Sequence, residues 1–193
     1  MKTAFRFLAA MLFVFFAPAH GAKFDADTVV LVARAALHGD FLYARSILIV
    51  KPIGADRHMG FILNKPTHLT LGEMYPDHAP SQKVKEPIRI GGPINSHVLF
   101  AIVKRSIPRQ GKAFEFLPDL YAIAERDGVD HAIEHESVQS RFFAGFVLWD
   151  AGELRAELER SFWYVVDADS SLLLEDAAGM WKALYGQAQK TPI

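Results

Sequence analysis

The sequence predicts one α+β domain built on a mixed β-sheet, and three observations support this. The chain has 193 residues, of which 51% are hydrophobic and 22% charged, as in a folded domain with a substantial core. Short β-branched runs outnumber the segments with helical periodicity, roughly eight to three or four. Because these strands and helices do not alternate strictly, a mixed sheet fits better than a doubly wound parallel one.

The first half of the chain is expected to form most of the strands. Each predicted strand is a short run rich in Val, Ile or Phe: Thr28–Ala33, Ser46–Val50, Gly60–Asn64, Ile88–Ile90 and Val98–Val103. Between them, Thr70 and Glu73 form a T-x-x-E capping box, so a short helix is expected to start at Leu71 and to end near Pro76. Residues 105–113 are polar and contain Pro and Gly, which predicts a surface loop.

The second half of the chain is expected to be richer in helix. A helix is predicted near Asp127–Glu136, another starts at Asp150, whose carboxylate would cap it, and a last one contains Trp181 and Leu184. The strands predicted around these helices are Phe142–Trp149, Tyr164–Val166 and Leu172–Leu174.

The N-terminus has the layout of a secretory signal peptide. Lys2 and Arg6 form a positive region, and an apolar run follows from Phe7 to Ala17. That run is much shorter than the roughly 20 apolar residues that span a bilayer, so no stable membrane anchor is expected.

Export follows from this interpretation. Residues 1–21 would be a signal peptide cleaved near Ala19 or Gly21, and residues 22–193 would form the mature domain in the periplasm or outside the cell. If residues 1–21 were not a signal, the protein would stay in the cytoplasm and a role in regulating transcription would become possible.

Charge and cysteine content exclude several classes of function. The chain has 21 basic and 22 acidic residues, and removal of Lys2 and Arg6 leaves 19 basic against 22 acidic ones. This balance lacks the basic surface of a nucleic-acid-binding protein, so no nucleic acid partner is expected. Cysteine is absent, which excludes disulfide bonds and a thiol nucleophile.

The stretch Asp130–Glu136 contains H-x-x-E-H, the pattern of inverted zincins, formed by His131, Glu134 and His135. At about 100° per residue, Val129, Ala132 and Ile133 share one helix face while these three residues point the other way, toward solvent. No histidine follows His135 to serve as a third ligand. A solvated helix face is therefore favoured, with no metal or other cofactor, and a zinc-dependent hydrolase remains the alternative.

Four stretches, taken in order, resemble blocks of the YqgE/AlgH family. Asp40–Ser46 resembles D-P-x-F-x-R-[ST] but lacks the proline, and His58–Pro66 resembles G-x-x-G-L-x-I-N-R-P with Lys65 in place of arginine. The other two matches are Gly91–Ile94, similar to G-G-P-V, and Ala144–Leu158, similar to G-Y-A-G-W-x-x-G-Q-L-E-x-E-L with glutamate at position 153.

This resemblance implies a compact domain with a flattened, barrel-like mixed sheet flanked by a few helices. It implies no enzymatic activity and no cofactor. Some members of the family have been linked to transcriptional regulation, which an exported protein could not perform on the chromosome.

We therefore expect a non-enzymatic binding or regulatory module that contacts a protein or a small ligand. The loops named above would line one concave surface, and the candidate ligand-binding residues are Arg45, Asn64, Gly91, Gly92, Trp149 and Glu153. Arg45 would clamp a carboxylate or phosphate with two hydrogen bonds, or else pair internally with an acid such as Glu153.

Overall fold

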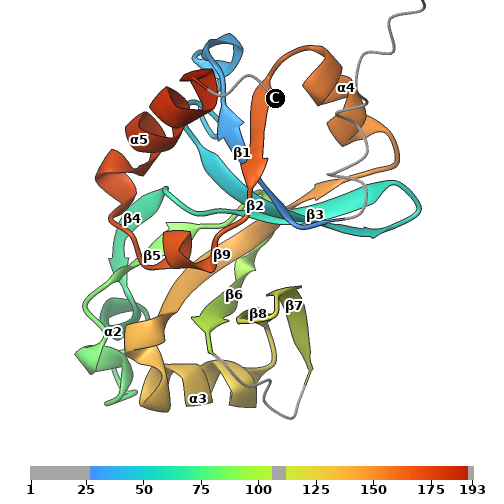
Figure 1. Ribbon diagram of the computed structural model, residues 1–193. Helices are drawn as coiled ribbons and strands as arrows, with labels where there is room; N and C mark the ends of the chain where they lie inside the picture. The colour runs from blue at the N-terminus through green and yellow to red at the C-terminus, as the bar shows by residue number, and fades with distance from the viewer. Residues whose placement is uncertain (1–26, 106–111, 191–193) are drawn as a thin grey trace, which may run out of the picture.

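A curled sheet of ten strands forms the centre of the molecule and closes to a half-barrel (Figure 1). The computed structural model describes residues 27–105 and 112–190. The strands are β1 (Val29–Ala33), β2 (Ile47–Gly54), β3 (Arg57–Ile62), β4 (Pro66–Thr70), β5 (Pro87–Ile90), β6 (Ile94–Lys104), β7 (Ala113–Leu117), β8 (Leu120–Ile123), β9 (Ser140–Trp149) and β10 (Trp163–Asp167).

The sheet is mixed, as predicted. The main path runs β10-β1-β2-β3-β9-β6-β8-β7, and β4 pairs with β5, which in turn pairs with β9. The β5–β9 pair is parallel, while every other pair of described strands is antiparallel. Strand β9 pairs with β3, β5 and β6. It therefore joins the strands β10-β1-β2-β3 to the strands β6-β8-β7 and to the pair β4-β5.

Four α-helices occur in the described residues: α2 (Leu71–Met74), α3 (Arg126–His135), α4 (Glu153–Glu159) and α5 (Ala177–Lys190). Short 3-10 turns complete the structure: η1 (Ala35–Leu37), η2 (Ser81–Lys83), η3 (Ser137–Gln139) and η4 (Ser170–Leu173). Helix α5 packs against β1 and β10, α4 against β3 and β10, and α3 against β6. In Figure 1, α4 and α5 lie at one end of the molecule and α3 at the other. No helix in the described part of the chain is long and apolar enough to cross a membrane.

Strand β1 and the first four residues of β2, Ile47–Val50, are buried on both faces, which explains their unbroken apolar sequences. Successive side chains of a strand point to opposite faces. Val30, Val32, Ile47 and Ile49 therefore join the cluster that includes Phe61 and Met180, while Leu31 and Leu48 join the cluster that includes Trp149 and Leu154.

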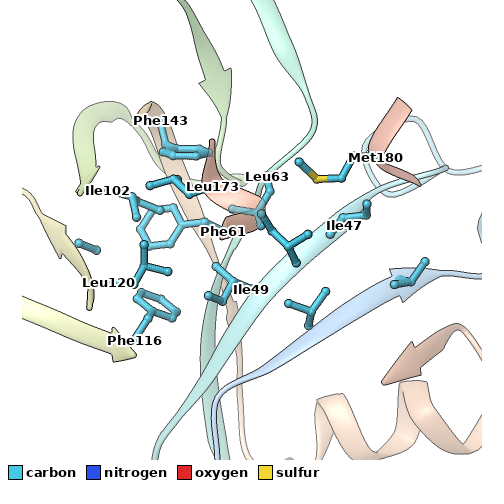
Figure 2. Packing of buried hydrophobic residues seen from close by; sticks show 14 residues of the cluster. Ile47, Ile49, Phe61, Leu63, Ile102, Phe116, Leu120, Phe143, Leu173 and Met180 are labelled. Carbon is cyan, nitrogen blue, oxygen red and sulfur yellow. The ribbon is translucent and has the colours of Figure 1, made fainter. Parts of the chain in front are cut away.

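Phe61 lies at the centre of the first cluster (Figure 2). Its ring centroid is 5.3 Å from that of Phe100, 5.7 Å from that of Phe116 and 5.8 Å from that of Phe143. Each such buried side chain stabilises the fold by roughly 1.5–3 kcal/mol. These four rings join β3, β6, β7 and β9.

Several predicted elements need correction. Leu172–Leu174 is not a strand, because the Asp169 side chain accepts from the Ser171 N–H and starts the η4 turn. Helix α4 begins at Glu153 rather than Asp150; its N-cap is Gly152 in the left-handed region with φ of 82°, and the Asp150 carboxylate makes no cap. The capping box of Thr70 and Glu73 is confirmed.

The prediction missed β4, β7 and β8. Strand β4 has no alternation of apolar and polar residues, and it is largely exposed. Strand β7 begins at Ala113, inside the predicted loop 105–113, while residues 106–111 of that loop lie outside the described residues. The predicted signal peptide, with its cleavage positions Ala19 and Gly21, lies outside them as well.

Candidate functional site

The predicted site residues occupy three separate places in the fold. Arg45 and Asn64 line a hollow beside α5. Gly91 and Gly92 are buried against β9. Trp149 and Glu153 lie at the connection between β9 and α4. The six residues therefore do not line one concave surface, and only Arg45 and Asn64 share a hollow.

The backbone of Arg45 is held in an unusual conformation by Asn64. Arg45 has φ of 55°, in the left-handed region that a residue with a side chain seldom adopts. The Asn64 Nδ2 donates to the Arg45 carbonyl at 2.9 Å, and the Asn64 Oδ1 accepts from the Ile47 N–H at 2.8 Å. One side chain thus fixes the chain on both sides of Ser46 and sets the direction in which Arg45 leaves the turn.

The turn before Arg45 is also well ordered by hydrogen bonds. The Asp40 Oδ1 accepts from the N–H groups of Leu42 and Tyr43 at 2.8 and 2.7 Å. The Tyr43 ring lies edge-on to Trp163, with 5.9 Å between centroids, and burial, together with the charges of Glu157 and Asp40, raises the pKa of Tyr43 to about 12. At the tip of this turn, Phe41 is 98% exposed.

The hollow has a volume of about 550 Å³ and lies between this turn and α5. We call it the Arg45 hollow. One side consists of Arg45, Asn64 and Lys65, and the other of α5 residues Ala177, Ala178, Trp181 and Lys182. The sequence prediction missed Lys65, Trp181 and Lys182 as site residues, because α5 reaches this place only through tertiary packing.

Three cationic side chains and no acidic one line the Arg45 hollow. Burial, and next the charge of Arg45, lower the pKa of Lys65, while Asp40 partly offsets this effect. The Lys65 Nζ donates to the Ala44 carbonyl at 2.7 Å, and the guanidinium carbon of Arg45 lies 5.8 Å from the centroid of the Trp181 ring. In the described residues none of the three cations is in an ion pair, so their charge remains available to a ligand.

Two buried arginines attach the segment just before α5 to the sheet. Arg89 is 3% exposed, and its Nη1 donates to the Leu63 carbonyl at 2.7 Å and to the Leu173 carbonyl at 3.4 Å. From β9, the Arg141 Nη2 donates to the Leu174 carbonyl at 3.4 Å. Burial, followed by the charge of Arg141, lowers the pKa of Arg89 to about 10. These contacts position the wall of the hollow that carries Trp181.

Gly91 and Gly92 allow β5 to approach β9 closely. A Cβ added to Gly91 would lie 2.2 Å from the Gly145 carbonyl oxygen, and one added to Gly92 would lie 2.2 Å from the Phe146 carbonyl carbon. The Gly91 N–H donates to the Ala144 carbonyl at 2.9 Å. In this structure the two glycines shape the sheet and offer no surface to a ligand.

Trp149 and Glu153 make hydrogen bonds that stabilise the connection between β9 and α4. Trp149 is 3% exposed, and its Nε1 donates to the Glu157 Oε2 at 3.0 Å, the oxygen that also accepts from the Trp163 Nε1 at 2.7 Å. The Glu153 Oε2 accepts from the Asp150 N–H at 2.8 Å. Within the described residues Glu153 forms no ion pair with Arg45, so the internal pair considered above is not formed.

The H-x-x-E-H residues lie on α3 with Val129, Ala132 and Ile133 buried on the opposite face. The ring centroids of His131 and His135 are 4.6 Å apart. The Glu134 Oε2 lies 3.4 Å from the His135 Nε2, and the Glu134 Oε1 lies 3.8 Å from the His78 Nε2. Among the described residues no group of three or more His, Cys, Asp or Glu side chains is arranged to hold a metal ion.

His78 also contacts Ser81, with 2.8 Å between Nδ1 and Oγ. Ser81, His78 and the Glu134 carboxylate therefore form a connected row of side chains. Such a set resembles the triad of serine hydrolases. Ser81, however, is 0% exposed, so its hydroxyl cannot reach a substrate. The contacts join the η2 segment to α3 and have a structural role.

The chain is similar in sequence to one protein family and to individual proteins of that kind. The family model described as AlgH-like (DUF179) matches residues 30–192. A UPF0301 protein of Chlorobaculum tepidum is 28% identical over 137 residues, which are 69% of this chain and 71% of that protein. A UPF0301 protein of Chlorobium luteolum is 29% identical over 143 residues, covering 72% and 74% of the two chains.

Two solved structures are similar in fold. The solution structure of AlgH from Pseudomonas aeruginosa has a TM-score of 0.70 at 22% identity and covers 85% of this chain and 88% of that one. The crystal structure of a Corynebacterium diphtheriae protein has a TM-score of 0.67 at 20% identity, covering 87% and 88%. With the family model matching nearly all of the described residues, the chain belongs to the AlgH-like family.

Proposed function

We propose that this protein is a non-enzymatic binding module that recognises an anionic group in the Arg45 hollow. The observation that carries the proposal is the gathering of Arg45, Lys65 and Lys182 around one hollow without an acidic residue in its lining. The nearest acids along the chain, Asp40 and Asp176, accept backbone N–H groups of their own turns.

The geometry of Arg45 supports recognition of a carboxylate or phosphate. A guanidinium donates two parallel hydrogen bonds to such a group, and a lysine adds a compact charge. Burial, and next the repulsion from Arg45, lowers the pKa of Lys65, and an anion between the two cations would relieve that repulsion. The turn that presents Arg45 is ordered by Asn64 and Asp40, so little conformational freedom is lost on binding.

A titration of the mature protein with inorganic phosphate tests the proposal. In ¹H–¹⁵N spectra we expect saturable shifts of amides near Arg45 and Lys182, with a dissociation constant in about the millimolar range that rises with NaCl concentration. Arg45→Gln should weaken binding about tenfold, since it removes the bidentate donor.

Arg160→Gln is the matched control, because Arg160 is an exposed arginine at the end of α4, outside the lining of the hollow. It should bind phosphate like the parent protein. If phosphate produces no saturable shifts, or if Arg45→Gln and Arg160→Gln behave alike, anion recognition in this hollow is wrong.

We also propose that the protein acts in the periplasm after removal of residues 1–21. The support is the positive region of Lys2 and Arg6 followed by the apolar run from Phe7 to Ala17. Cell fractionation with intact-mass measurement should find a mature chain that starts close to Ala19 or Gly21. Detection of the full-length chain in the cytosol alone would contradict export.

A further inference from the structure

We infer that the ligand of the Arg45 hollow is an anion attached to a flat aromatic group, such as an aromatic carboxylate or phosphate. This inference rests on the proposed function and adds a chemical class to it. Its basis is Trp181, whose ring lines the same hollow as the three cationic side chains.

Trp181 is held firmly in place. Its Nε1 donates to the Ala33 carbonyl of β1 at 2.9 Å, and its ring packs on Tyr185 with 4.6 Å between centroids and an angle of 34° between planes. Because this indole N–H already has a partner, it makes no demand on a ligand. What the ring offers to the hollow is therefore an apolar surface in a fixed orientation.

Arg45 covers this ring loosely. The guanidinium carbon lies 5.8 Å from the Trp181 centroid, whereas that of Arg34 lies 4.4 Å from the centroid of Tyr164 in the same protein. The shorter distance corresponds to close stacking and the longer one leaves the ring less covered. Two small side chains, Ala177 and Ala178, line the hollow beside the ring, and they leave room for a flat group.

These features divide the hollow into two subsites. Arg45, Lys65 and Lys182 attract the charged end of a ligand, and Trp181 with Ala177 and Ala178 accepts an apolar plane next to it. The volume of about 550 Å³ falls within the range of roughly 300–1,000 Å³ usual for small-molecule sites. An inorganic anion would use only the first subsite, and an uncharged aromatic compound only the second.

Three probes separate these contributions: inorganic phosphate carries only the charge, phenol only the ring, and phenyl phosphate both. The chain has three tryptophans, and the indole N–H groups of Trp149 and Trp163 both donate to Glu157. In ¹H–¹⁵N spectra the Trp181 indole signal reports on the hollow, while the other two indole signals serve as internal controls.

We expect phenyl phosphate to bind about fivefold more tightly than inorganic phosphate, since an aromatic pair contributes about 0.5–1.5 kcal/mol. It should shift the Trp181 indole signal and leave those of Trp149 and Trp163 unchanged. Trp181→Leu should reduce the affinity for phenyl phosphate to that for inorganic phosphate, with phosphate binding retained, and Arg45→Gln should weaken both.

The outcomes separate the inference from the proposed function. If inorganic phosphate binds and phenyl phosphate binds no more tightly, the aromatic subsite is wrong and anion recognition stands. If phenyl phosphate and phenol bind equally while phosphate does not bind, the hollow is apolar and both ideas fail. Should Trp181→Leu unfold, Trp181→Phe keeps a ring in the hollow and should retain most of the preference; its loss would also count against the inference.

Discussion

Asn64 and Arg45 form one unit: the Asn64 amide bridges the Arg45 carbonyl and the Ile47 N–H while Arg45 keeps a φ of 55°. A non-glycine residue in this region costs about 1–3 kcal/mol and persists where its surroundings impose it. The strain is located at the residue that faces the hollow, so the fold maintains the direction of this guanidinium against a local cost.

Asn64→Ala removes both hydrogen bonds. We expect a loss of about 1–3 kcal/mol in the free energy of unfolding, because the Ile47 N–H is left without its partner, and weaker phosphate binding because Arg45 is released. Urea denaturation and the phosphate titration measure the two effects. Unchanged phosphate affinity in a stably folded Asn64→Ala protein would show that Asn64 does not position Arg45.

Arg89→Met should be destabilising. It leaves the Leu63 and Leu173 carbonyls without their shared donor in a buried place, and we expect a loss of about 1–3 kcal/mol. Arg89→Lys keeps the charge but lacks the branched donor and should lose less. A midpoint of urea unfolding for Arg89→Met within error of the parent value would contradict the anchoring of α5 by Arg89.

Gly91→Ala and Gly179→Ala should have opposite effects on stability. A Cβ at Gly91 would meet the Gly145 carbonyl oxygen at 2.2 Å, whereas a Cβ at Gly179, within α5, would meet nothing within 4 Å. We expect a loss of roughly 2 kcal/mol or more for Gly91→Ala, and a gain of about 0.5–1 kcal/mol for Gly179→Ala from helix propensity. Thermal unfolding of the two variants side by side is a direct comparison, and equal midpoints would refute the packing argument.

Tyr43 should make stability depend on alkaline pH. Its pKa is raised from 10.0 to about 12 in the folded protein, so the folded state binds the phenolic proton more tightly than the unfolded state. The contribution is complete below pH 10 and is lost as the pH rises through about 12. Urea midpoints measured between pH 9 and pH 12 should therefore fall, and Tyr43→Phe should make the fall shallower.

Tyr75→Phe is the control for that series, since Tyr75 is an exposed tyrosine of the α2 C-terminus. It should leave the slope unchanged. Equal slopes for Tyr43→Phe and the parent protein would assign the alkaline loss of stability to other groups.

The sequence predicted those parts of the fold that depend on local pattern. Apolar runs identified β1 and β2, and helical periodicity placed Val129, Ala132 and Ile133 on the buried face of α3. The predicted strand Leu172–Leu174 was wrong because the hydrogen bond that the Ser171 N–H donates to the Asp169 carboxylate outweighed the propensity of three leucines.

The site was only partly predictable for a related reason. Arg45 and Asn64 stand next to strands whose limits are visible in the sequence, and the prediction included both. Lys65 was noted only as a substitution, and Trp181 and Lys182 belong to a helix brought to the hollow by packing on β1 and by the buried arginines. Arg89, in the strand Ile88–Ile90, carried no pattern that distinguishes a buried anchor from an exposed cation.

The shared acceptor of Trp149 and Trp163 ties together two distant strands of the sheet. β9 and β10 are separated in the sheet by β1, β2 and β3, yet an indole from each donates to the same oxygen of Glu157. Helix α4, which connects the two strands in the chain, therefore links β9 to β10 across the face of the sheet that carries Leu31 and Leu48. Any change in the relative position of β9 and β10 would strain both hydrogen bonds at once, so one carboxylate couples two strands that do not pair with each other.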